Sequence, residues 1–255
     1  MPEATPTLRL LRKLENFTTL SDAERALVVQ SVGQPRELGP HEDLMREGEL
    51  VITTSVILSG FACRQKMLPD GRRQIIGYLL PGDICDVRIC LNQRMDHTIS
   101  TISAARVAAL SRDTLFDQTG RHPGLMRALC WASLVEESVV REWLLNVGQR
   151  TALERLAHLF CEIFVRLRAV GLTDGDSCEL PVTQAQLADT LALSTVHVNR
   201  TLRELRHANL ISIRAKSLII HDFDSLKSIA LFDASYLHLE GERTVPRVAR
   251  SSSVA

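Results

Sequence analysis

The sequence predicts an α+β protein with three parts, a β-roll, a long helix and a winged helix-turn-helix. In the first half, glycines recur roughly every ten residues, at positions 39, 48, 60, 71 and 82, between short apolar runs. Such regular turn signals are typical of an all-β sandwich or roll. Residues 123–149 then have apolar side chains at helical spacing. Residues 181–221 show two short helical patterns followed by two β-branched runs.

Composition limits the possible classes of protein. The chain has 255 residues, of which 45% are hydrophobic, and no formal net charge. This length favours two domains, and the hydrophobic content is enough for each to bury a hydrophobic core. The zero net charge predicts that long-range electrostatic attraction of a charged partner is modest. No run approaches the ~20 apolar residues that a membrane helix needs. The first residues lack a secretory pattern, so we expect a cytoplasmic protein without a membrane partner.

The N-terminal half is expected to begin with two short helices, at residues 7–14 and 21–29. Ser21 is placed to cap the second helix, with Glu24 three residues further on. The strands expected after them lie at 56–58, 75–80, 97–102 and 106–110, with hairpin turns at 69–71 and 81–83.

Pro123 stands where the first turn of a long helix is expected, running to about Asn146 and ended by Gly148. The spacing of its apolar residues is 3-4-3-4, as in the seam of a two-stranded coiled coil. These residues are Leu125, Ala128, Ala132, Val135 and Val139. Burial against the protein's own roll would produce the same stripe, so both interpretations stand. A further helix is expected from Thr151 to Arg168, with Gly171 as its stop.

Two helices joined by a tight turn are predicted at residues 183–207. Thr183 and Gln186 are spaced as a capping box, and Ser194 is a strong N-cap for the second helix. The inward-facing residues of the pair are Leu187, Leu191, Val198, Leu202 and Leu205. Ala192 occupies the turn, where a left-handed conformation would cost alanine about 1 kcal/mol.

The opposite face of the second helix is a polar, basic ridge of a width that fits a DNA major groove. It is formed by Val196, Asn199, Arg200 and Arg203. An ordinary surface helix would show the same ridge, but two β-branched runs, 210–213 and 218–221, follow it around a polar turn. A helix pair followed by a hairpin predicts a winged helix-turn-helix. From 194 to 217, five basic residues stand against the single acid Glu204.

The side-chain chemistry gives no sign of an enzyme or a metal site. A Gly-rich phosphate loop, GxSxG and HExxH are all absent, and the eight histidines are dispersed without metal-ligand spacing. The six cysteines include no CxxC pair, and most are expected to be small buried residues. Cys178 follows a polar stretch at 173–177, which predicts an exposed thiol with a possible redox role.

The segment STVHVNRTLRELRHANLI, preceded by TQAQLADTLAL, resembles the CRP/FNR family of bacterial transcription regulators. The resemblance extends from about Leu11 to Ala230. It implies N-terminal helices and a cyclic-nucleotide-binding-like β-roll (double-stranded β-helix) at 1–121, a dimerisation helix at 122–149 and the winged helix-turn-helix at 150–235. A disordered tail is expected at 236–255. The resemblance also implies a homodimer on an inverted-repeat operator, with double-stranded DNA and RNA polymerase as partners.

Aligned with the family, Thr195, Val196 and Arg200 fall on the positions that face bases. Only Arg200 keeps the residue type of the cyclic-AMP-binding relatives, and we expect it to donate bidentately to the guanine of a G·C pair. Val196 is expected to contact a thymine methyl. The remaining members of the expected DNA-contact set are Asn199 and Arg203 of the ridge and, as phosphate contacts, Thr183, Gln184, Ser194, His197 and Lys216.

In the relatives that bind cyclic AMP, a Gly-Glu-Leu stretch and a later Arg-Ser hold the ribose and phosphate. Here Val87 replaces the glutamate and His97 the arginine, so cyclic AMP is not expected to bind. The candidate effector residues are Gly82, Asp86, Arg88, His97 and Thr98. No cysteine precedes Cys63, so an iron–sulfur cluster is not expected. The alternative function is a ligand-binding regulatory subunit that uses the roll without binding DNA.

Overall fold

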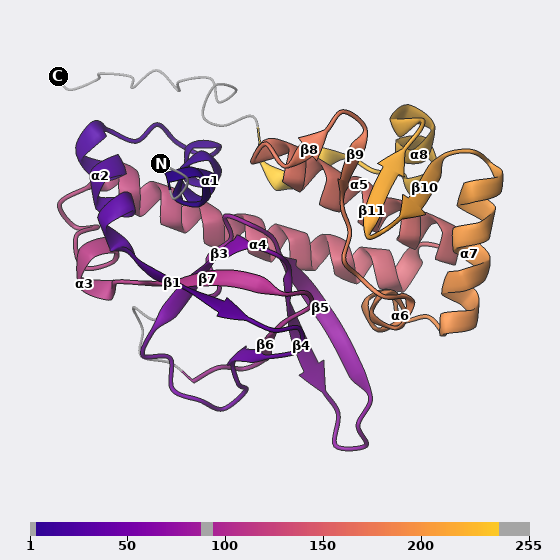
Figure 1. Ribbon diagram of the computed structural model, residues 1–255, viewed down its shortest axis with the longest axis horizontal. Coiled ribbons are helices and arrows are strands. Elements are labelled where there is room, and N and C mark those ends of the chain that lie inside the picture. Colours follow the sequence, from indigo (N-terminus) through magenta and orange to yellow (C-terminus); the bar gives the residue numbers. More distant parts are fainter. Residues whose placement is uncertain (1–3, 88–93, 240–255) are drawn as a thin grey trace, which may run out of the picture.

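The structure, a computed structural model, describes residues 4–87 and 94–239 (Figure 1). It begins with helices α1 (Ala4–Glu15) and α2 (Asp22–Ser31). The expected capping box is confirmed, because the Ser21 hydroxyl accepts from the Glu24 N–H while Glu24 accepts from the Ser21 N–H at 2.8 Å. Glu24 also accepts from the backbone N–H of Leu125, which fastens α2 to the start of the long helix.

Two antiparallel sheets form the β-roll that the sequence predicts. One contains β1 (Val32–Leu38), β7 (Ala105–Leu110) and β3 (Thr54–Ser59), in that order. The other has the order β2 (Asp43–Met45), β6 (Thr98–Thr101), β4 (Ala62–Met67) and β5 (Arg73–Leu79). Strands β1, β2 and β4 were not predicted, because β2 has only three residues and β1 and β4 carry no regular alternation of apolar and polar residues. A short helix, α3 (Arg112–Leu115), ends the roll.

Both expected turns are present, but the one at 81–83 does not close a hairpin, because Ile84 after it bridges Val56 of β3 and does not pair with β5. Gly71 has φ +86° in the turn between β4 and β5, where the Leu68 N–H donates to the Arg72 carbonyl at 2.8 Å. Gly82 has φ +96°, and a Cβ added there would lie 3.0 Å from the carbonyl oxygen of Arg9. Glycine is therefore needed at position 82 both for its conformation and for the close approach of α1.

Helix α4 (Pro123–Gln149) connects the two halves of the molecule and lies behind the roll in Figure 1. Proline stands at its first turn as expected, but the helix does not end at Gly148. Arg150 is the first residue with extended backbone, and Thr151 immediately caps the next helix. The chain therefore turns from one helix into the other without a glycine stop.

The C-terminal half has helix α5 (Ala152–Ala169) at its centre, with Leu156, Phe160 and Ile163 fully buried. Around it lie β8 (Thr173–Asp174), β9 (Ser177–Glu179), α6 (Gln184–Leu191), α7 (Thr195–His207), β10 (Ile211–Arg214), β11 (Ser217–Ile220) and α8 (Phe223–Ala230). The sheet order is β10-β11-β9-β8. The predicted winged helix-turn-helix is confirmed.

The expectation of a disordered tail from residue 236 was wrong for residues 236–239. A 3-10 helix, η2 (Ala234–Leu237), packs against α4 and α5. The Tyr236 hydroxyl donates to Glu162 at 2.8 Å, Leu237 is buried, and the ring of His238 lies 5.1 Å from that of Trp131. The burial of Leu237 and the contacts of these two rings order the segment, while the residues after 239 lie outside the described part.

None of the helices in the described ranges combines the length and apolar character required to cross a bilayer.

Candidate nucleic-acid interface and effector cavity

The helix pair α6 and α7 is built by the local signals expected from the sequence. The Thr183 and Gln186 side chains form the predicted capping box, and the Ser194 hydroxyl accepts from the His197 N–H at 3.2 Å. Between the helices, Ala192 has φ +53°, the left-handed conformation expected at this turn. The predicted inward leucines and valine are all buried, which fixes the rotation of both helices.

The outer face of α7 carries the predicted ridge at the edge of the molecule (Figure 1). Val196 is 76% exposed, an unusual position for a large apolar side chain. Arg200 and Arg203 are exposed and Asn199 is half-buried. The Arg200 guanidinium lies 3.7 Å from Glu204, and such an exposed pair is weak, so the arginine remains available to a ligand.

The residues expected to contact phosphate lie around the N-termini of the two helices. Thr183, Gln184, Ser194, Thr195 and His197 are all exposed. Backbone N–H groups at a helix N-terminus favour anions. Two of the hydroxyls are already engaged as caps, and Gln184 accepts a hydrogen bond from Asn199.

The wing is the hairpin of β10 and β11. Ala215 and Lys216 have φ +47° and +66°, the two positive values that a tight two-residue hairpin turn requires. Lys216 is exposed at the tip, and its carbonyl accepts from the Leu180 N–H at 2.7 Å. The wing is therefore tied to the strand leading into α6, which places Lys216 on a rigid support.

The prediction of an exposed, oxidisable thiol at Cys178 was wrong. Cys178 is 3% exposed, because side chains alternate along β9 and this one faces the core, opposite Leu218 of β11. Burial raises the pKa of its thiol to about 12, so it stays protonated. Of the five cysteines in the described residues, the exposed one is Cys130 on α4.

Contacts between the roll and α6 were not predicted from the sequence. Arg73 of β5 donates to Asp189 through two guanidinium nitrogens, at 2.8 and 2.6 Å. Tyr78, which is fully buried, bonds the Thr190 hydroxyl at 2.5 Å. These partners lie more than 100 residues apart in the chain, so no local pattern identifies them. Together they fix the helix-turn-helix against the roll.

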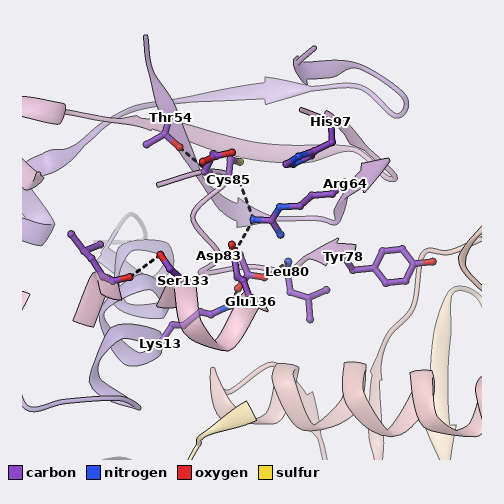
Figure 2. A network of polar contacts seen from close by, with 12 residues as sticks. Lys13, Thr54, Arg64, Tyr78, Leu80, Asp83, Cys85, His97, Ser133 and Glu136 are labelled. Carbon is purple, nitrogen blue, oxygen red and sulfur yellow. Dashed lines mark hydrogen bonds and ion pairs between the residues drawn. The ribbon is translucent and has the colours of Figure 1, made fainter. Parts of the chain in front are cut away.

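A cavity of about 580 Å³ lies between the roll, α1 and α4. Its wall is mainly apolar, with a few charged side chains that converge on it, as is typical of ligand sites. Arg64 from β4 donates to Glu136 of α4 at 2.6 Å and to the Cys85 carbonyl at 3.0 Å (Figure 2). The arginine therefore joins the roll to the long helix across the cavity.

Asp83 is the second charged centre of this cavity. Its carboxylate pairs with Lys13, which reaches it from α1 (Figure 2). It also accepts from Arg166 of α5 at 2.8 Å. Burial, together with the charge of Arg166, lowers the pKa of Lys13 well below its ordinary value. One carboxylate thus holds the N-terminal helix, the roll and the first helix of the C-terminal half together.

The predicted effector residues are not all gathered in the cavity as a binding set. Gly82, Asp86 and His97 line it, but Gly82 serves the turn against α1, and His97 bonds Asp96 at 2.6 Å. Thr98 accepts from the Glu47 N–H at 3.1 Å on the roll. Arg88 lies outside the described residues. Sequence reasoning missed Asp83 and several other charged wall residues. Among these are Lys13, Arg64, Glu136 and Arg166, which come from four separate elements.

The apolar stripe expected as a coiled-coil seam on α4 faces the protein itself. Leu125, Ala128, Val135 and Val139 are buried against the roll and α5, and Ala132 is half-buried. Interpreting this stripe as the seam between two chains was therefore wrong, and the other interpretation left open, burial within the chain, is confirmed. The apolar residues of this stripe form part of the hydrophobic core of the single chain.

A second stripe on α4, with the spacing 4-3-4-3-4, is exposed except for the half-buried Ser133, and its middle part also borders the cavity. We call it the outer stripe, and it comprises Met126, Cys130, Ser133, Glu137, Val140 and Leu144. Val140 is 54% and Leu144 70% exposed, and Leu134 and Leu145 beside the stripe are also exposed. This periodicity is the heptad pattern of a two-stranded coiled coil.

His158 of α5 is fully buried between the rings of Phe232 and Tyr236. Burial, and then the charge of Arg150, lowers its pKa from 6.5 to about 3. An unfolded chain protonates this ring below about pH 6.5, whereas the folded chain does not. The free energy of unfolding should therefore fall as the pH drops from 6.5 toward 3, by up to about 1.4 kcal/mol per pH unit.

The variant His158→Phe keeps the aromatic packing and removes the titration, so we expect a flatter stability profile between pH 7 and pH 5. Urea unfolding of both proteins at these two values measures the difference. Equal slopes for the two proteins would mean that His158 does not cause the pH dependence.

Two protein-family models match the chain. The cyclic nucleotide-binding domain matches residues 35–122, and the Crp-like helix-turn-helix domain matches residues 154–229. The nitrogen fixation regulation protein FixK of Azorhizobium caulinodans is 27% identical over 208 residues, covering 81% of this chain and 83% of FixK. The transcriptional activator protein FnrL of Cereibacter sphaeroides is 25% identical, covering 80% and 84%. The structure of FixK2 from Bradyrhizobium japonicum has a TM-score of 0.70 at 23% identity, covering 80% of this chain and 100% of that one.

Proposed function

Because this chain belongs to the CRP/FNR family of transcription regulators, we propose that it binds an inverted-repeat operator as a homodimer, with the β-roll as its sensory domain. Its relatives are transcription regulators, and no enzyme family is indicated. The observation that carries the proposal is the exposed ridge of α7 beside a rigid wing with a basic tip. A regulatory subunit that binds only a ligand has no need of this surface. We place the regulator in the cytoplasm, with RNA polymerase as its second partner.

The outer stripe of α4 supports the proposed homodimer. Two copies of α4 packed in parallel along this stripe would bury Val140 and Leu144, which otherwise remain exposed. A dimer of helix-turn-helix proteins presents its two recognition helices to half-sites that lie one turn of the double helix apart, about 34–36 Å, on one face of the DNA. An inverted repeat is the operator that matches such a two-fold axis.

The proposed function is tested by selecting bound sequences from a random duplex library, with and without cell extract. A homodimeric regulator returns an inverted repeat, and a requirement for extract would point to a small-molecule signal. Purified protein that retains no duplex at low salt, with or without extract, would favour the regulatory subunit instead.

Replacing Arg200 by alanine is expected to cost about 1–3 kcal/mol of binding free energy at the operator and to relax preference at one G·C pair. Lys216→Ala should weaken binding to all sequences alike and reduce the salt slope, because it removes a phosphate contact. Competition gel shifts with operator and mutated duplexes measure both effects. An unchanged sequence preference in Arg200→Ala would show that α7 does not read the bases as proposed.

We propose that the signal sensed by the roll is not cyclic AMP. Val87 brings an apolar side chain to the cavity wall where the ribose-binding glutamate of relatives would stand. Arg64 is paired with Glu136, and Lys13 and Arg166 with Asp83, so a phosphate would have to displace a carboxylate from each of these cations. Isothermal calorimetry should detect no binding of cyclic AMP in the micromolar range. Micromolar or tighter binding would overturn this proposal.

A further inference from the structure

One hydrogen bond joins the two helices of the helix-turn-helix on the side proposed to face DNA. The side-chain amide of Asn199 on α7 donates to Oε1 of Gln184 on α6 at 2.9 Å. Gln184 is the first residue of α6, and Asn199 lies between Val196 and Arg203 on the ridge. Neither side chain is needed for the core, since Gln184 is exposed and Asn199 half-buried.

This bond couples the orientation of the Asn199 amide to that of the Gln184 amide. An asparagine amide has two N–H donors and one carbonyl acceptor. One N–H is used by Gln184, and the carbonyl Oδ1 accepts no hydrogen bond within the described residues. A free asparagine can rotate its amide and exchange the two groups, whereas here Asn199 can do so with the bond kept only if the exposed Gln184 amide rotates as well. In the observed orientation Asn199 presents one acceptor and one donor side by side.

Among the base edges of the major groove, adenine alone offers the complementary pair, its N6 amino donor beside its N7 acceptor. Guanine offers two acceptors, so the Oδ1 of Asn199 would meet another acceptor without a proton between them. Cytosine offers a donor without an adjacent N7, and thymine an acceptor beside a methyl group. In the orientation set by Gln184, the amide is thus selective for one base of the four.

We propose that Asn199 is a specificity-determining residue that reads an adenine bidentately, and that Gln184 is the positioning residue that sets its amide. This assignment rests on the proposed DNA-binding function. Asn199 directly precedes Arg200 on the ridge, and the adenine is assigned to the base pair next to the G·C pair read by Arg200. The two amide protons of Gln184 remain for a phosphate oxygen at the N-terminus of α6.

The experiment measures affinities for duplexes that differ only at the A·T pair beside the G·C pair of the selected operator. Wild-type protein should discriminate against the other three pairs by about 5- to 150-fold, the range of one bidentate contact. Asn199→Ala should lose this discrimination and keep the preference for the G·C pair. Circular dichroism confirms that the helices of each variant are retained.

Two substitutions of Gln184 separate positioning from phosphate binding. Gln184→Ala removes the acceptor and should reduce the adenine discrimination several-fold, as well as weaken binding overall. Gln184→Glu keeps an acceptor for Asn199 but places a negative charge near phosphate. It should therefore preserve the discrimination ratio while lowering affinity for every duplex.

The possible failures are distinguishable. If the wild type selects an operator but shows no adenine at this pair, or if Asn199→Ala keeps that preference, the assignment to Asn199 is overturned and the proposed function stands. If Gln184→Ala discriminates as well as the wild type, the positioning role is overturned. A wild type without any sequence preference overturns the proposed function and this assignment together.

Discussion

Replacing Val140 and Leu144 together by glutamate is expected to convert the protein to monomers and to lower its affinity for an inverted repeat by about 10²- to 10⁴-fold. Both side chains are on the outer stripe of α4 and at least half exposed in the single chain. Charges at these positions would be desolvated and would repel across a two-fold axis. A monomer loses the second half-site, and with it the gain from simultaneous binding. Sedimentation velocity and gel shifts measure the two effects.

The control is Ile52→Glu, which places one glutamate at an apolar residue of the roll that is 72% exposed. This variant should remain dimeric and bind the operator as the wild type does. Cys130 gives a positive test, because a short bismaleimide should join two wild-type chains, whereas Cys130→Ser should not react in this way. A double glutamate variant that stays dimeric would show that the interface lies elsewhere.

Replacing Glu162 by alanine is expected to lower the free energy of unfolding by about 3–5 kcal/mol. Its carboxylate is fully buried and accepts from Trp143 at 2.9 Å, from Tyr236 at 2.8 Å and from Arg166 at 3.1 Å. Removing it leaves the Trp143 N–H and the Tyr236 hydroxyl without an acceptor. It also removes one of the negative charges that pair with Arg166. The effect is large because α4, α5 and η2 all meet at this one group.

Urea unfolding at one fixed protein concentration measures the loss, because dimerisation would make stability depend on concentration. Glu162→Gln keeps acceptors for Trp143 and Tyr236 but not the charge, so an intermediate loss is expected. As the control, Glu37→Ala removes the exposed pair with Arg106 and should cost less than about 1 kcal/mol. Equal losses for Glu162→Ala and Glu37→Ala would contradict the central role of Glu162.

Much of the candidate DNA-binding surface could be predicted from the sequence because its determinants are local. Thr183, Ser194 and Ala192 act on backbone groups within a few residues of themselves, so the caps and the turn follow from spacing alone. The inward leucines then fix which face of α7 remains outside. The same locality made the helices capped by Ser21 and Thr151 predictable.

Other parts of the site depend on contacts between distant segments. The cavity wall takes Lys13 from α1, Arg64 from β4 and Arg166 from α5, and no periodicity relates these positions. The pair of Arg73 with Asp189 joins residues 116 apart. Cys178 was predicted to be exposed from its polar neighbours, but the pairing of β9 with β11 buried it.

Helix α4 shows both what local sequence spacing determines and what only contacts between distant segments determine. Its sequence by itself determined a long amphipathic helix, because apolar residues recur at helical spacing from Leu125 to Val139. Two stripes with heptad-like spacing exist on this helix, and spacing cannot distinguish a face that packs on its own chain from one that meets another chain. The tertiary structure decided which stripe is buried. The stripe with Leu125 packs into the core of its own chain and the stripe with Leu144 remains exposed, because only one face of a helix can contact the roll.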